Sequence, residues 1–154
     1  MSSIPNPDAP DLARAATRIS STYFMRSLRL LADFHGGELL RALIFQAIVT
    51  ANTAHLDETE GPVRYAGQDS PPPDEVRRAI SVLALSDGIG LPFETVRRHV
   101  NKLLASGQCV RVKGGVIVPQ AAIEGEAVQD MRHLNLANIK RMQRDLRRIG
   151  VEPD

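Results

Sequence analysis

The strongest constraint on the fold is an amphipathic helical pattern followed at once by an alternating pattern, in residues 91–120, LPFETVRRHVNKLLASGQCVRVKGGVIVPQ. Val96, Val100 and Leu103 recur at the spacing of a single helix face. The segment 93–105 is therefore expected to form a helix whose apolar face packs against a core.

Turn and cap residues mark the limits of the elements in this segment. Pro92 suits the entry to the helix, and Gly107 stands where a helix-ending glycine belongs. The stretches QCVRVK and VIVPQ then alternate around Gly114-Gly115. A diglycine flanked by alternating apolar residues predicts a tight two-stranded hairpin.

The side of the expected helix opposite its apolar face is polar and basic. Arginine can pair with guanine O6 and N7, and glutamate can accept from cytosine N4. Lysine, threonine and asparagine suit phosphate oxygens. A pair of adjacent arginines alone is more typical of a solvated surface, so the prediction depends on the basic hairpin that follows. The residues expected at a DNA surface are Phe93, Glu94, Thr95, Arg97, Arg98, Asn101, Lys102, Arg111 and Lys113.

Charge is distributed unevenly along the 154 residues, although the net charge is only +1. Residues 1–75 hold six basic and ten acidic groups, whereas residues 76–118 hold seven basic groups against Asp87 and Glu94. A basic centre in a nearly neutral chain favours an anionic partner for that centre.

The remaining chain divides into a few further segments. Residues 1–20 hold three prolines and little apolar periodicity and are interpreted as a flexible arm, and the rest, 21–154, is expected to form a single domain. Helices are expected from Ser21 to about residue 35, from 38 to 56, over 82–89 with Ser81 as the N-cap, and over the tail within 120–150. Residues 57–75 are interpreted as a solvated loop, and residues 76–80 as a short strand.

Two apolar patterns predict helix packing and a partner. Residues 39–51 are apolar nearly all round, which favours burial of both faces. That stretch is too short to span a bilayer, so it is interpreted as a core helix and not as a membrane segment. Ile139, Met142, Leu146 and Ile149 form a narrow seam in the tail. These two features predict a homodimer, in which the N-terminal helices and the tail helix form the interface.

The order of short strand, helix, turn, helix and hairpin resembles the winged helix-turn-helix domain of bacterial transcriptional regulators. The resemblance covers about residues 76–119, with Gly90-Leu91-Pro92 as the turn, ETVRRHV as the start of the recognition helix and VRVKGGVIV as the wing. Helix 38–56 would supply the first helix of the module, separated by an unusually long loop. The expected fold is thus mainly α, with a small β-hairpin wing and flanking helices.

This resemblance implies sequence-specific binding of double-stranded DNA by a dimeric regulator. The start of the recognition helix, here Phe93, Glu94 and Arg98, would enter the major groove, and Arg111 and Lys113 would lie along the backbone or in the minor groove. Two alternatives remain open. One is a winged-helix module that binds proteins and no nucleic acid. The other is a ligand-sensing regulator with a pocket among the apolar helices of residues 22–56.

Enzymatic and metal-binding functions find no support in the sequence. The four histidines lack ligand spacing, and neither diglycine is followed by the Lys-Ser/Thr of a phosphate loop. No nucleophile, base and acid share a recognisable context, so neither an enzyme nor a cofactor is expected. Cys109 is the only cysteine, and no signal-peptide pattern opens the chain, which favours a cytoplasmic location.

Overall fold

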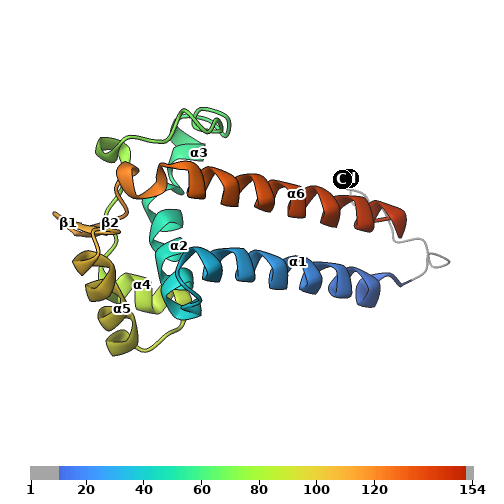
Figure 1. The fold of residues 1–154 in the computed structure, drawn as a ribbon, viewed down its shortest axis with the longest axis horizontal. Helices are drawn as coiled ribbons and strands as arrows, with labels where there is room; N and C mark the ends of the chain where they lie inside the picture. Colours follow the sequence, from blue (N-terminus) through green and yellow to red (C-terminus); the bar gives the residue numbers. More distant parts are fainter. Residues whose placement is uncertain (1–10, 152–154) are drawn as a thin grey trace.

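The computed structural model describes residues 11–151, which are mainly helical with one small antiparallel hairpin (Figure 1). This confirms the expected helix-rich class with a hairpin after the helices. The elements in chain order are α1 (Ala13–Phe34), α2 (Leu39–Thr53), α3 (Leu56–Thr59), the 3-10 turn η1 (Asp74–Val76), α4 (Val82–Ile89), α5 (Phe93–Ala105), β1 (Val110–Val112), β2 (Gly115–Ile117), the 3-10 turn η2 (Gln120–Ile123) and α6 (Glu126–Arg148).

Helices α2, α4 and α5 pack with the hairpin around one aliphatic core. Val96, Val100 and Leu103 of α5 are fully buried, which confirms the predicted apolar face of this helix. They belong to the same core cluster as Ile44 and Ile48 of α2, which are also fully buried. Burying each such aliphatic side chain contributes about 1.5–3 kcal/mol, so this cluster fixes which side of α5 faces solvent.

Helices α1 and α6 form a long antiparallel pair that projects away from the rest of the molecule (Figure 1). A polar ladder joins them near their middle. The Asn138 side-chain amide donates to the Tyr23 carbonyl at 3.2 Å and to Ser27 Oγ at 3.0 Å, and Ser27 Oγ donates to Asn135 at 3.3 Å. The name arm is used below for this pair, α1 and α6.

The two ends of the chain differ from the sequence-based boundaries. Helix α1 begins at Ala13 and not at Ser21, so the prediction that residues 1–20 form a flexible N-terminal segment is wrong from residue 13 onwards. Residues 1–10 lie outside the described residues. The Ala13 amide donates to Asp11 Oδ1 at 3.0 Å at the start of the helix, and Ile19, in the added turns, lines a cavity together with Met142 of α6. The expected tail helix is interrupted at Gly125, which separates η2 from α6.

The strand expected just before α4 is present only in part. Residues 76–80 were predicted to be a strand, but only Ile80 pairs, through an antiparallel bridge to Val116 with N···O distances of 3.1 and 3.0 Å. Upstream of it, the Arg78 amide donates to the Asn52 carbonyl at the end of α2. The backbone is thus hydrogen-bonded to a helix where a strand partner was expected.

Asn52 joins three segments of the core and is fully buried. Its amide nitrogen donates to the carbonyls of Arg78 at 2.6 Å and Val116 at 3.2 Å. Its amide oxygen accepts from the Val118 N–H at 2.9 Å. A buried amide with all these partners satisfies backbone groups that a small, incomplete sheet would leave unpaired.

The caps and the hairpin follow the sequence signals closely. Ser81 Oγ accepts from the Ala84 amide at 3.1 Å at the start of α4, and Gly90 ends α4 in the left-handed region at φ 68°. Val112 pairs with Gly115, so the hairpin loop is Lys113-Gly114 and lies one residue before the predicted Gly114-Gly115. A Cβ at Gly115 would overlap the Ile80 carbonyl, so this glycine permits the close approach of the bridge.

Helix α2 is only partly covered within one chain. Its inner face is buried, but the side chains of Leu39, Leu40 and Leu43 are each 40–45% exposed. Counted with α3, the helical stretch Leu39–Thr59 has 21 residues and passes a length-and-hydropathy test for a membrane span, unlike the shorter 39–51 considered from sequence. The core helix of a soluble protein passes the same test, so this is weak evidence for a membrane segment.

Candidate nucleic-acid interface

The outward face of α5 carries most of the residues predicted to bind DNA. The three buried residues on its other side hold Arg98, Asn101 and Lys102 towards solvent. Thr95 lies at the edge of the face and is partly buried, while Phe93 opens the helix with 42% of its surface exposed. The predicted orientation of this helix is therefore correct.

The hairpin lies next to this face. Every residue of β1 is exposed, and Lys113 is exposed in the hairpin loop. The guanidinium of Arg111 approaches Asn101 of α5, with 3.5 Å between Nη2 and Oδ1. The predicted residues of α5 and of the hairpin thus belong to one continuous surface, here called the basic face: Phe93, Glu94, Thr95, Arg97, Arg98, Asn101, Lys102, Arg111 and Lys113.

Arg97, one of the two adjacent arginines, is already paired with a carboxylate. Arg97 Nε donates to both carboxylate oxygens of Glu94, at 3.1 and 3.0 Å, and Nη2 donates to Oε2 at 2.8 Å. These hydrogen bonds lower the pKa of Glu94 and raise the pKa of Arg97. Glu94 and Arg97 are three residues apart on a helix, and this spacing is the sequence signal from which the pair could have been predicted. Arg97 is therefore not a free cation in this structure.

The other basic side chains of the face lack acidic partners. Within residues 11–151, no ion pair joins Arg98, Lys102, Arg111 or Lys113 to a carboxylate. Four positive charges on adjoining elements create a local positive potential, although the chain as a whole is almost neutral. This arrangement suits a polyanion more than an isolated small anion.

Apolar side chains are interspersed with these charges. Val110 and Val112 of β1 are 38% and 42% exposed, comparable to Phe93. These valines were not among the predicted functional residues, because alternation alone did not show that both sides of β1 are exposed.

Two reactive side chains near the face have structural roles. His99 is half-buried, and burial, followed by repulsion from Lys102 and Arg98, lowers its pKa, so it is neutral near pH 7. Cys109 is buried, and burial raises its pKa to about 12. Its thiol stays protonated and matches the predicted role of a small apolar core residue. In the described part of the chain, no three His, Cys, Asp or Glu side chains are grouped as metal ligands would be.

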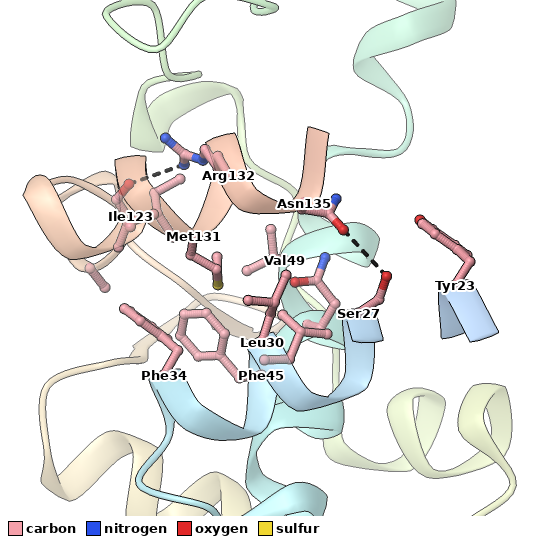
Figure 2. Close-up of a pocket in the computed structure, with 14 residues that line it drawn as sticks. Tyr23, Ser27, Leu30, Phe34, Phe45, Val49, Ile123, Met131, Arg132 and Asn135 are labelled. Carbon is pink, nitrogen blue, oxygen red and sulfur yellow. Dashed lines mark hydrogen bonds between the residues drawn. The ribbon is translucent and has the colours of Figure 1, made fainter. Parts of the chain in front are cut away.

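A second candidate site lies at the base of the arm. A cavity of about 340 Å³ is enclosed by α1, α2, η2 and α6 (Figure 2). Leu30, Phe34, Phe45 and Met131 form its apolar part. The sequence pointed to residues 22–56 for any ligand pocket, but it could not show that α6 closes the cavity.

Comparison with known proteins gives no relative for this chain: no protein-family model, no curated protein and no solved structure matches it.

Proposed function

We propose that this protein binds double-stranded DNA through the basic face and acts as a transcriptional regulator. The observation that carries the proposal is the joining of α5 to the hairpin by the Arg111–Asn101 contact, with Arg98 and Lys102 unpaired beside it. The opposite side of α5 is locked into the core, so the face is presented rigidly. A preordered cationic surface loses little entropy when it meets phosphates.

The order of elements supports a winged helix-turn-helix interpretation of this part of the chain. Helix α2, the Ile80 bridge, α4, α5 and the β1–β2 hairpin follow one another as in that domain. In this interpretation α5 lies in the major groove, where Arg98 reads base edges. Arg111 and Lys113 lie along the phosphate backbone and add affinity without sequence preference.

A homodimer formed by the arm completes the proposal. Helix α1 is 22 residues long yet contains no buried residue, and Phe24 and Met25 are about 60% exposed. On α6, Leu134 is 56% exposed. A second copy of the arm would bury these side chains in a helical bundle. The corollary is an operator with two-fold symmetry, whose half-sites are one helical turn or a multiple apart.

The test is a fluorescence-polarisation titration with random duplex DNA at two salt concentrations. The log of the binding constant should fall with the log of salt, and removing four phosphate-contacting cations should flatten that slope by about 3–4. The variant is Arg98→Ala, Lys102→Ala, Arg111→Ala and Lys113→Ala combined. A matched control removes four exposed arginines of the arm, Arg14, Arg29, Arg147 and Arg148, and thus changes the net charge equally. Equal losses from both variants would count against the basic face.

A protein-interaction module is the second candidate, favoured by Phe93, Val110 and Val112, which are exposed on the same elements as the basic residues. Apolar and aromatic side chains are typical of the core of a protein interface, and polar residues of its rim. The two candidates differ in the titration above. Salt-dependent binding of duplex supports DNA, and no binding at low salt supports the interaction module.

A further inference from the structure

Two further arginines, Arg77 and Arg132, lie away from the basic face, beside a cavity at the junction of α2, the 57–75 loop and α6. The cavity has a volume of about 370 Å³, which is within the range of small-ligand sites. Its walls combine apolar side chains, including Val49, Leu56, Pro62, Tyr65 and Ile123, with polar ones such as Thr50 and Thr53. Arg77 and Arg132 belong to the same wall.

Arg77 is a buried cation with incomplete hydrogen bonding. Its side chain has no exposed surface. Nη2 donates to the Pro72 carbonyl at 2.8 Å, but Nε is 3.6 Å from Asp74 Oδ1, too far for a hydrogen bond. Within the described residues, neither Nε nor Nη1 has an acceptor. Asp74 Oδ1 instead accepts from the Gln120 amide at 2.6 Å. An incompletely paired buried guanidinium is costly and calls for a further anionic partner.

Arg132 contributes a second positive charge without a counter-ion. Nη1 donates to Gln68 Oε1 at 3.1 Å. Nη2 donates to the Ile123 carbonyl at 3.0 Å, the bond drawn in Figure 2. Both acceptors are neutral. Burial lowers the pKa of Arg77, Asp74 opposes this effect, and repulsion from Arg132 adds to it. The two guanidinium groups therefore already repel each other across this region.

We propose that this cavity binds a small organic anion, a carboxylate with an apolar body, whose charged group contacts Arg132 and lies close to the buried charge of Arg77. An anion there would offset the charge of Arg77 and screen the repulsion between the two arginines. The apolar side chains of the wall match a hydrocarbon body and not a bare inorganic ion. Asp57 also lines the cavity, but it is exposed and forms no ion pair with either arginine.

The cavity at the base of the arm gives the apolar body room to extend. It shares Gln46, Val49, Ile123 and Arg132 with the Arg77 cavity, so the two adjoin. Figure 2 shows Leu30, Phe34 and Phe45 on its far side from Arg132. A chain or ring anchored by its carboxylate at the arginines would lie against these side chains.

This assignment also explains the long 57–75 loop. The loop contributes Pro62, Tyr65 and Pro72 to the cavity wall. Gln68 anchors it to α6, because its amide donates to the Gln129 carbonyl at 3.2 Å while its oxygen accepts from Arg132. The loop thus forms one side of the site.

The test is calorimetric titration of the full chain, without DNA, with benzoate, octanoate, benzamide and inorganic phosphate. Benzoate and octanoate should bind and raise Tm, whereas benzamide, which has the same shape as benzoate but no charge, and phosphate should not. Arg132→Gln should raise the Kd for the carboxylates by about tenfold or more, the usual effect of losing a charge-assisted hydrogen bond. Arg141→Gln, an exposed position on α6, is the matched control and should leave Kd unchanged.

Arg77→Gln is a second variant, and it should also weaken carboxylate binding. If its melting curve shows that it does not fold, Arg132→Gln alone decides the question. Three results would overturn the proposal: neither carboxylate binds at millimolar concentration, benzamide or phosphate binds as well as benzoate, or Arg132→Gln binds carboxylates like the parent chain. Since the titration contains no DNA, each result is independent of the proposed regulatory function.

Discussion

Replacing Glu94 with Gln should strengthen binding to DNA, because it releases Arg97. In the structure the Glu94 carboxylate accepts all three of the hydrogen bonds that Arg97 makes on the surface of α5. Glutamine keeps the size and helix propensity of the residue but removes the negative charge. The change therefore gives the basic face one more free cation and removes the one carboxylate that would repel phosphates.

The magnitude follows from counting phosphate contacts. One additional contact steepens the log–log salt slope by about 0.9, which corresponds to roughly eightfold tighter binding at 0.1 M salt. Arg97 hydrogen bonding lowers the pKa of Glu94, so the carboxylate stays ionised above that lowered pKa and is neutralised only as the pH falls through it. A pH change near neutrality therefore cannot mimic the substitution.

The assay is a polarisation titration of random duplex at several salt concentrations, for the parent chain, Glu94→Gln and Glu94→Gln with Arg97→Ala. The gain in affinity and slope should appear in the single variant and disappear in the double variant. Glu58→Gln, exposed in α3, is the matched control for loss of one carboxylate. An unchanged slope in Glu94→Gln, or an equal gain in the double variant, would refute the role assigned to the Glu94–Arg97 pair.

Further expected outcomes concern DNA binding, the hairpin, the core and assembly. Arg98→Ala should cost about 1–3 kcal/mol on a preferred operator and much less on random duplex, whereas Arg97→Ala should weaken both alike, because it leaves the Glu94 carboxylate unpaired beside the phosphates; equal losses from the two variants in titrations on both DNAs would contradict the orientation of α5. Replacing Arg111 and Lys113 together with Ala should flatten the salt slope by nearly 2, and an unchanged slope would make the hairpin a structural element only. Asn52→Ala should lower the free energy of unfolding by about 2–4 kcal/mol in urea denaturation, because the Arg78 carbonyl and the Val118 N–H lose their partner and the Val116 carbonyl loses one of two; a loss below about 1 kcal/mol would count against its joining role. Light scattering should give a dimer, and the monomer mass of 16.8 kDa at micromolar concentration would contradict assembly through the arm.

The candidate DNA surface could be predicted mostly from local patterns. The spacing of Val96, Val100 and Leu103 set the buried side of α5, and that alone placed Arg98 and Lys102 in solvent. The pattern could not show whether the Arg97 side chain is free or paired. Its pairing with Glu94 depends on side-chain rotamers, which helical spacing permits but does not impose.

The cavity between Arg77 and Arg132 could not be predicted, because its walls come from parts of the chain far apart in sequence. Arg77 was interpreted as part of a short strand and counted only as one of several central basic groups. Its burial, and its position near α6, require the fold of the 57–75 loop, which has no periodic pattern to interpret.

Local signals in the sequence determined the elements whose energetics are local. Ser81 caps α4, Gly90 ends it, and the glycine after Lys113 permits the tight hairpin, because caps and turns depend on a few adjacent residues. Tertiary structure alone decided the reduction of the expected strand to Ile80 and the clamp made by Asn52. In both of these, a backbone or side-chain group is satisfied by a partner more than twenty residues away, and such a contact leaves no periodic trace in the sequence.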